Sequence, residues 1–104
     1  MRSYQLSNTL FQRAKEIIPG GVNSPVRACR SVGRDPVFIR SADGPMIKDA
    51  DGNEFIDFLC CYGPIILGYR EDEVDEAVYK QIKEKGFCFT LTQKYQNLLA
   101  KKLI

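Results

Sequence analysis

The sequence predicts an α+β segment that consists of an N-terminal helix, a three-stranded antiparallel meander and two further helices. Three observations lead to this fold class. Apolar residues between positions 3 and 18 repeat with the 3.6-residue period of a helix. Short apolar runs then alternate with tight polar turns over residues 36–59, as in strands joined by hairpins. After residue 71 the helical period returns twice.

The first predicted element is a helix over residues 3–18. Its apolar residues fall on one stripe of a 3.6-residue period: Leu6, Leu10, Phe11, Ala14, Ile17 and Ile18. Proline cannot continue the helical hydrogen-bond ladder and glycine frees the chain to turn, so Pro19-Gly20-Gly21 should end the helix. We interpret the stripe as a core-packing face.

The next segment, residues 22–27, is predicted to be an ordered, strand-like loop and not a helix, because Pro25 pushes the residue before it into an extended conformation. Ser24 and Arg27 then stand on a stiff backbone. A planar guanidinium beside a short hydroxyl donor suits a carboxylate. The two residues are therefore candidates for binding an anionic substrate, while the alternative is that Arg27 is an ordinary surface arginine.

Three apolar runs predict the strands of the meander, at residues 36–40, 46–47 and 55–59. Polar residues separate them at 41–44 and 49–53. Gly52 accepts a positive φ without a Cβ clash, and Asp51 and Asn53 suit turn positions. We therefore expect the second and third strands to form a tight hairpin.

The same polar turn resembles the start of a calcium-binding loop, because Asp49, Asp51 and Asn53 alternate along the chain. The register fails, however. If Asp49 were the first ligand, Glu54 would occupy the position that needs glycine, and Cys60 the position that needs a bidentate glutamate. The sequence therefore favours a hairpin over a calcium site.

Glycine and proline lie among large apolar residues in segment 60–69, so its backbone must turn sharply while buried or close to a ligand. Acidic residues at 71–73 then predict a helix start, where negative charge complements the helix dipole. Lys83, Lys85 and Gly86 predict its end. Residues 87–90 connect it to a last helix from about Thr92. The apolar stripes of the two helices are Val74, Ala77, Val78 and Ile82, and Tyr95, Leu98, Leu99 and Leu103.

Composition argues against several functions. Lys+Arg number 15 and Asp+Glu 13, and their signs alternate along the chain, so no basic footprint for nucleic acid is present. No apolar run reaches the roughly 20 residues of a membrane span, and the start of the chain lacks the apolar region of a signal peptide. Without histidine, a catalytic triad cannot form and a zinc site is not expected.

The four cysteines are Cys29, Cys60, Cys61 and Cys88, and no CxxC spacing occurs among them. Cys60 and Cys61 are adjacent and are expected on a strand, where they would point to opposite faces. This arrangement suits packing better than a disulfide. We therefore expect reduced thiols and a cytoplasmic location.

Three stretches together resemble the N-terminal part of the class III, pyridoxal-phosphate-dependent aminotransferases: IIPGGVNSPVRA (17–28), PVFIRSADGPMIKDADGNEFIDF (36–58) and YGPIILGY (62–69). The resemblance runs in order from about Leu10 onward. The segment D-x-D-G-N-x-[FY]-I-D, here residues 49–57, is common to many class III enzymes. The segment PGGVNSPVR, residues 19–27, is far more specific and is similar to the glutamate-1-semialdehyde 2,1-aminomutases.

The resemblance implies that Ser24 and Arg27 bind the substrate carboxylate and that Tyr62 lines the substrate pocket. It also shows departures. Tyr62 stands where the family usually has tryptophan, Cys61 where serine is common, and Tyr69 where the aminomutases usually have histidine. These changes alter the pocket wall and leave the carboxylate clamp intact, so they bear on the substrate more than on the chemistry.

For the fold, the resemblance implies an α/β pyridoxal-phosphate-dependent transferase of fold type I, similar to aspartate aminotransferase. Residues 1–62 would form the N-terminal helix, substrate loop and meander, and residues 63–104 would begin the large cofactor-binding domain. The whole protein would be a homodimer that uses pyridoxal 5′-phosphate (PLP) on a small, amino-acid-like carboxylate. The implied reaction converts glutamate-1-semialdehyde to 5-aminolevulinate for tetrapyrrole (porphyrin) synthesis, and the alternative is another class III aminotransfer reaction.

The family's Schiff-base lysine has no counterpart in these 104 residues. The eight lysines are expected on exposed helix faces, at chain turns or beside the hairpin, and none has the desolvated setting of an activated lysine. We therefore expect a fragment that has no catalytic or cofactor-binding residue of its own and is inactive alone. A different class of function stays open, namely a small interaction module that has kept this segment without catalysis.

Overall fold

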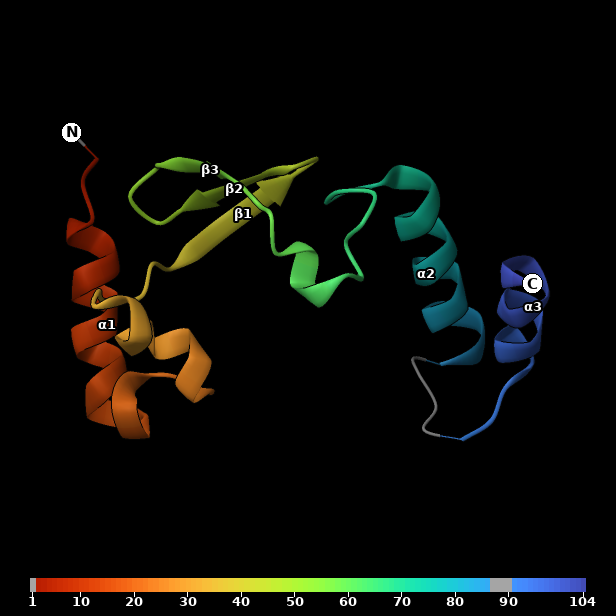
Figure 1. Ribbon diagram of the computed structural model, residues 1–104, viewed down its shortest axis with the longest axis horizontal. Helices are drawn as coiled ribbons and strands as arrows, with labels where there is room; N and C mark the ends of the chain where they lie inside the picture. Colours follow the sequence, from red (N-terminus) through yellow and green to blue (C-terminus); the bar gives the residue numbers. More distant parts are fainter. Residues whose placement is uncertain (1, 87–90) are drawn as a thin grey trace. The chain divides into compact units, whose positions relative to one another are not determined.

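The computed structural model describes residues 2–86 and 91–104. Its helices and strands, in chain order, are α1 (Gln5–Ile17), β1 (Ile39–Asp43), β2 (Met46–Asp49), β3 (Glu54–Ile56), α2 (Asp72–Lys85) and α3 (Lys94–Leu103) (Figure 1). Four short 3₁₀ turns join them: η1 (Pro19–Gly21), η2 (Pro25–Ala28), η3 (Arg30–Val32) and η4 (Cys60–Tyr62). The chain divides into two units, residues 1–71 and 72–104. The predicted domain division after residue 62 concerns a longer protein and stays a prediction.

The predicted antiparallel meander is confirmed, with strand order β1-β2-β3. The limits predicted for its first strand are wrong, because β1 spans Ile39–Asp43 where the sequence predicted 36–40. Gly44 has a φ of +50°, and this left-handed residue allows a tight loop that pairs Asp43 with Met46. Strand pairing therefore extends into residues that were predicted to be the turn.

The second hairpin has the predicted turn, but the limits predicted for its last strand are wrong, because β3 spans Glu54–Ile56 where the sequence predicted 55–59. Gly52 has a φ of +88°, and the turn closes through an N–H of Asp49 that donates to the Asn53 carbonyl at 3.0 Å. Beyond the turn, Lys48 pairs with Glu54 across the two strands, and their side chains form an ion pair at 2.9 Å. Cross-strand pairs of opposite charge support the register of such a hairpin.

Helix α1 begins two residues later than predicted and ends before the diglycine as predicted. Phe11 is buried, and its ring packs on Gly21 so closely that a Cβ there would lie 2.6 Å from a ring carbon. The rest of the predicted stripe is only partly covered, since Leu6 is 48% exposed and Ile17 is 80% exposed. The core-packing interpretation therefore holds for Phe11 and not for the two ends of the stripe.

The segment after the diglycine is only partly extended. Ser24 has φ −150° and ψ 136°, as predicted for a residue before proline. The prediction of a strand-like loop is wrong after Ser24, because Pro25–Ala28 form the 3₁₀ turn η2. Proline is well suited to the first position of a helical turn, where its missing N–H costs nothing.

Cys60 and Cys61 do not lie on a strand, so that prediction is also wrong. Their φ angles are +49° and +53°, and Tyr62 follows with +63°. A strand would require extended φ angles, whereas these three residues form a left-handed turn. The sharp turn expected in this segment is present, but its large side chains are not buried, since Tyr62 is 79% and Ile66 82% exposed. Cys29, Cys60 and Cys61 are free thiols. Cys88 and the predicted connection at 87–90 lie outside the described residues.

The second unit consists of α2 and α3. Acidic side chains of Asp72, Glu73 and Asp75 occupy the first turn of α2, and Gly86 follows its end with a φ of +88°. Both features agree with the helix predicted there. The Tyr95 hydroxyl of α3 donates to the Gln81 side-chain oxygen of α2 at 3.0 Å. No helix in the described part of the chain is long and apolar enough to cross a membrane.

We expect the isolated chain to self-associate, because its helices leave apolar side chains exposed. Among the described residues, the buried apolar side chains are Phe11, Ala28 and Pro36, while Val78 and Leu99 are 47% and 59% exposed. Apolar stripes of this size are association surfaces. Sedimentation velocity should give a coefficient that rises with protein concentration. A monomer that persists at high concentration and unfolds cooperatively would contradict the expectation.

Candidate functional site

The two predicted carboxylate ligands lie on one turn. Ser24 precedes η2 and Arg27 lies within it, and the N–H of Arg27 donates to the Ser24 carbonyl at 3.0 Å. Ser24 is half-buried and Arg27 is exposed. The Arg27 guanidinium makes no hydrogen bond or ion pair with any described residue, so its fork of donors is available to an anion. The turn thus brings the two predicted ligands together on one backbone.

Ser24 also lines a cavity of about 270 Å³, with Asn23 and the guanidinium-bearing Arg30 among its other lining residues. Arg27 is not part of that lining. Arg30 opens the following turn, η3. Sequence reasoning missed Arg30, because its spacing from Arg27 does not show that it lines the same cavity as Ser24; the left-handed residue Cys29, with a φ of +55°, separates the two turns.

Tyr62 lies on η4, with 79% of its surface exposed. No hydrogen bond or ion pair joins it to Ser24 or Arg27 in the part of the chain that the structure describes. The predicted clamp and the predicted aromatic wall are therefore built by separate turns, each with its own local support.

Asp57 and Tyr69 form a hydrogen-bonded pair that supports the turn of Tyr62, and sequence reasoning did not predict this pair. The Tyr69 hydroxyl donates to Asp57 Oδ2 at 2.7 Å. The other carboxylate oxygen accepts from the N–H of Leu59 at 2.8 Å and from that of Cys60 at 3.3 Å. Twelve residues separate the two partners, so no local sequence pattern indicates their contact.

The pair shifts the ionisation of both partners. The hydrogen bond from Tyr69, followed by the N–H of Leu59, holds the pKa of Asp57 below its usual value, although partial burial opposes this. The same hydrogen bond, with burial and the negative charge of Asp57, raises the pKa of Tyr69 to about 12. At neutral pH a carboxylate therefore faces a protonated phenol.

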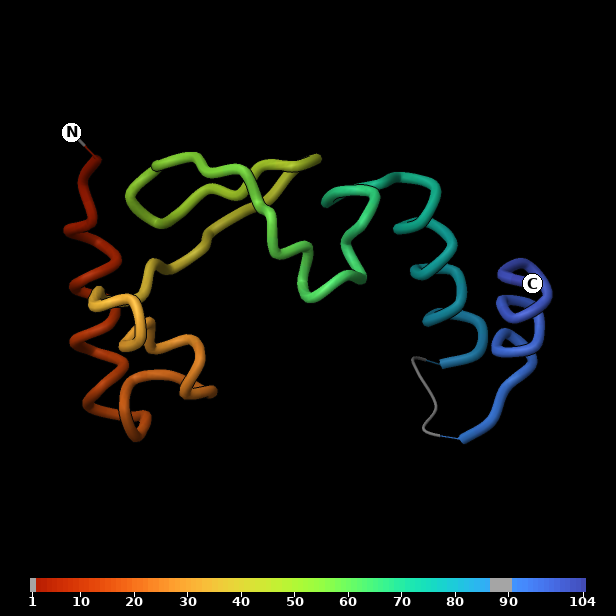
Figure 2. The backbone as a smooth tube through the Cα atoms, in the orientation of Figure 1, coloured from red at the N-terminus to blue at the C-terminus, as the bar shows by residue number. Residues whose placement is uncertain are grey.

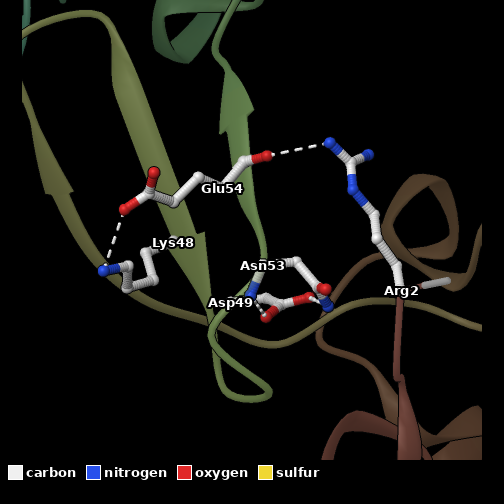
Figure 3. A network of polar contacts seen from close by, with 5 residues as sticks. All are labelled: Arg2, Lys48, Asp49, Asn53 and Glu54. Carbon is white, nitrogen blue, oxygen red and sulfur yellow. Dashed lines mark hydrogen bonds and ion pairs between the residues drawn. The ribbon is translucent and has the colours of Figure 1, made fainter.

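The D-x-D-G-N turn connects the hairpin to the N-terminal residues (Figure 3). Asp49 is fully buried and accepts from the backbone N–H and from the side-chain amide of Asn53, both at 2.7 Å. That amide also donates to the Ser3 carbonyl at 2.6 Å. Nearby, Arg2 donates to the Glu54 carbonyl at 3.1 Å. The alternating polar residues thus hold the protein's own backbone.

Asp51 caps helix α1 across the fold. Its two carboxylate oxygens accept from the backbone N–H groups of Leu6 at 2.7 Å and Ser7 at 2.8 Å. Partial burial would raise the pKa of Asp51, but these N–H groups and the hydroxyls of Ser7 and Ser3 together lower it below its usual value. A carboxylate at a helix N-terminus satisfies donors that have no partner within the helix.

These shifts predict how stability depends on pH. Asp51 and Asp57 have lowered pKa values, so their contribution is present above about pH 3.8 and is lost as the pH falls through the folded-state values. Tyr69 has a raised pKa, so its contribution is present below pH 10.0 and is lost as the pH rises toward about 12. Thermal unfolding followed by circular dichroism should give a midpoint that falls at both extremes. The Tyr69→Phe variant should lose part of the alkaline fall, and an unchanged wild-type midpoint from pH 7 to 12 would contradict the assignment.

Residues 29–104 match the model of a protein family described as aminotransferase class-III. Among curated relatives, the chain is 57% identical over 98 residues to a 3-aminobutyryl-CoA aminotransferase of Cloacimonas acidaminovorans (strain Evry), covering 93% of this chain and 24% of the relative. It is 47% identical over 104 residues to a glutamate-1-semialdehyde 2,1-aminomutase of Bacillus subtilis (strain 168), covering 100% of this chain and 24% of that protein. The chain thus spans about a quarter of the length of these relatives.

A solved structure described as a transaminase with PLP bound superposes on this chain with a TM-score of 0.76 at 31% identity. The match covers 99% of this chain and 23% of that structure. The helix, meander and following helices thus recur together as one contiguous portion of a larger transaminase fold.

Proposed function

Because this chain belongs to the class-III aminotransferase family, we propose that it is the N-terminal part of an enzyme that moves an amino group on a small, amino-acid-like carboxylate. The observation that carries the proposal is the η2 turn, where Ser24 and Arg27 stand on one short stretch of backbone and the Arg27 guanidinium has no partner among the described residues. Such a pair of donors suits a carboxylate.

PLP is the cofactor of this family, and it supplies an electron sink for carbanions. The described residues do not fit a covalent site for it. A Schiff-base lysine needs a lowered pKa, which requires desolvation or a nearby cation. Lys48 is half-buried but pairs with Glu54, and the other described lysines are exposed. In the proposed enzyme, the lysine that holds the cofactor would therefore lie outside these 104 residues.

Because the described lysines do not fit a covalent cofactor site, we expect no specific PLP adduct on the isolated chain. Mixed with PLP and reduced with borohydride, the 104 residues should give only scattered, substoichiometric modification of exposed lysines. Peptide mapping by mass spectrometry measures this, and a surface-acetylated sample of the same chain serves as the background control. A stoichiometric adduct at a single lysine would contradict the expectation.

In the proposed mechanism, this chain binds and orients the substrate. Arg27 holds a carboxylate through two parallel hydrogen bonds, and Ser24 adds a shorter donor. Tyr62 lines the substrate pocket. Fixing a substrate in this way lowers the entropic part of the barrier for chemistry that takes place elsewhere in the protein.

The first candidate reaction is that of a glutamate-1-semialdehyde 2,1-aminomutase, which gives 5-aminolevulinate for tetrapyrrole synthesis. Its support is the segment PGGVNSPVR at residues 19–27, together with 47% identity to such an enzyme along the whole chain. Glutamate-1-semialdehyde keeps one free carboxylate, which fits Arg27.

The second candidate is amino transfer on a 3-aminoacyl-CoA thioester. It is favoured by 57% identity to the relative named for such a substrate and by Tyr62 and Tyr69, which depart from the usual aminomutase residues. The carboxyl group of a thioester carries no charge. In this reaction Arg27 would therefore bind the carboxylate of the amino donor or of its keto product. Binding of the acyl-CoA substrate would not require Arg27.

The experiment is a substrate comparison with the full-length protein that carries these residues. Glutamate-1-semialdehyde alone should yield 5-aminolevulinate if the first candidate holds. Formation of 3-aminobutyryl-CoA from acetoacetyl-CoA and an amino donor would favour the second. Turnover of neither substrate, nor of other amino acids, would refute the proposed function and leave the interaction module.

The same proposal includes a homodimer in the cytoplasm. The exposed apolar side chains of α1, such as Ile17, are available to a second subunit. Analytical ultracentrifugation of the full-length protein tests the dimer, and a monomer at micromolar concentration would refute it.

A further inference from the structure

The loop between Asp57 and Tyr69 is fastened at both ends to the β1–β2 turn. At its start, the N–H of Asp57 donates to the Pro45 carbonyl at 2.9 Å. At its end, Gly44 and Tyr69 exchange two backbone hydrogen bonds of 2.9 Å and 2.8 Å. Figure 2 shows the chain leaving β3 and returning to that turn. The loop, which carries Tyr62, thus leaves the sheet and returns to it at the same turn.

The middle of this loop is strained. Cys60, Cys61 and Tyr62 have φ angles of +49°, +53° and +63°, and none of them is glycine. Each left-handed L-residue costs free energy, and such residues persist only where the surrounding structure holds them. A sequence of three in a row therefore needs a specific restraint.

Asp57 provides that restraint at the start of the turn. Its Oδ1 accepts from the N–H groups of Leu59 and Cys60, and these bonds fix the backbone just before the left-handed residues. Its Oδ2 is held by the Tyr69 hydroxyl at 2.7 Å. The side chain of the residue that ends the loop therefore orients the carboxylate that starts it.

We propose that Asp57 and Tyr69 are positioning residues of the substrate pocket, and that their hydrogen bond holds the left-handed turn that presents Tyr62. This inference rests on the proposed function, because it assigns Tyr62 to the pocket wall. Tyr62 touches the substrate in this scheme, whereas Asp57 and Tyr69 act through the backbone of the turn.

Close packing at the C-terminal end of the loop also supports a positioning role for Tyr69. A Cβ on Gly68 would lie 2.9 Å from the Gly44 carbonyl oxygen, so the backbone of the loop returns within contact of the β1–β2 turn. Tyr69 follows directly, and its hydroxyl reaches back to Asp57. Since the phenol stays protonated well above neutral pH, the restraint is present throughout the range in which an enzyme would act.

The first test needs no activity. Amide hydrogen exchange should be measured at Tyr62 and Gly63, whose N–H groups donate to the carbonyls of Leu59 at 2.9 Å and Cys60 at 2.8 Å. In Tyr69→Phe, exchange at these amides should accelerate about tenfold, as expected for loss of a hydrogen bond to a charged group. Exchange at Lys48, in β2, should not change.

Two variants control this measurement. Tyr79→Phe removes a hydroxyl from an exposed tyrosine of α2 and should leave the turn unaffected. Tyr69→His keeps a hydrogen-bond donor but is shorter than tyrosine, so it should restore only part of the protection. Unchanged exchange at Tyr62 and Gly63 in Tyr69→Phe would overturn the proposal.

The second test uses the full-length protein. Tyr69→Phe should raise the KM for the amino-group substrate about tenfold with a smaller change in kcat, because the pocket wall is misplaced in a protein that still folds. Tyr69→His should recover the KM only in part. A fall in kcat alone that parallels a lower melting temperature would overturn the positioning role. If the wild-type protein is inactive, the proposed function fails instead, and the exchange experiment still decides whether the pair holds the turn.

Discussion

Replacing Arg27 by alanine in the full-length protein should lower kcat/KM for a carboxylate substrate by about ten- to a hundredfold. The loss corresponds to about 1.5–3 kcal/mol for hydrogen bonds to a charged group, at 1.4 kcal/mol for each factor of ten. The guanidinium has no internal partner among the described residues, so its removal leaves no orphaned group and the protein should remain folded. Steady-state kinetics at varied concentrations of the carboxylate substrate measures the effect, with any other substrate held at saturation.

Two variants sharpen this result. Arg27→Lys should recover only part of the loss, because a point charge cannot replace a planar fork of donors. Arg13→Ala, an exposed arginine on α1, should leave kcat/KM unchanged. If Arg27→Ala had wild-type kcat and KM, the assignment of the clamp would be wrong, and Arg30 in the Ser24 cavity would be the next residue to test.

Replacing Asp49 by alanine should give the largest loss of stability of any single change in the hairpin. The side chain is fully buried and satisfies two donors of Asn53, which itself holds the Ser3 carbonyl. Its removal leaves those donors without their acceptor, which costs about 1–3 kcal/mol. Amide exchange of Asn53 measures the loss locally, without requiring that the chain unfold in one step.

Asp49→Asn tests the reason for the effect. The amide keeps the volume and one acceptor but turns a second donor toward the Asn53 side chain, so it should recover only part of the protection. Asp43→Ala is the matched control, since that carboxylate is exposed and its pair with Arg70 at 3.6 Å is a surface ion pair. Equal exchange at Asn53 in Asp49→Ala and in wild type would contradict the role of Asp49.

Several elements were predictable because their causes are local. The proline and diglycine at 19–21 end α1, Gly52 forms the hairpin turn, and the acids at 71–73 introduce α2. In each case the residue's own backbone preference or charge determines the structure within one turn of the chain. The same holds for the meander, whose apolar runs and turns lie next to one another in sequence.

The predictions failed where two conformations were locally similar in cost. Residues 41–43 suit a turn as well as a strand, and pairing with β2 made them part of β1. Pro25 permits either an extended segment or a helical turn after it, and the structure has the turn η2. Cys60 and Cys61 are a different case, because left-handed backbone is costly for a residue other than glycine and depends there on the restraint by Asp57.

Some residues of the candidate site were likewise identified from the sequence, and others only from the structure. The sequence alone identified Ser24, Arg27 and Tyr62 through a resemblance, and placed the first two on a stiff segment because a proline follows the serine. It did not identify Arg30 or Asp57, and it named Tyr69 only as a departure from the family's usual histidine. The contact between Asp57 and Tyr69 spans twelve positions, which no period of 2 or 3.6 residues encodes, and Arg30 is found only as a lining residue of the Ser24 cavity.

The sequence by itself therefore determined the order of the helices and strands and the hairpin turn, since short-range sterics and charge decide them, while the carboxylate clamp stays a prediction. Only the tertiary structure decided what the polar turn residues bind. Asp51 accepts from the N–H groups of Leu6 and Ser7, whose positions are 45 and 44 residues away along the chain. A carboxylate can satisfy any nearby donor, so its partner is set by which segments the fold brings together and not by the residue itself.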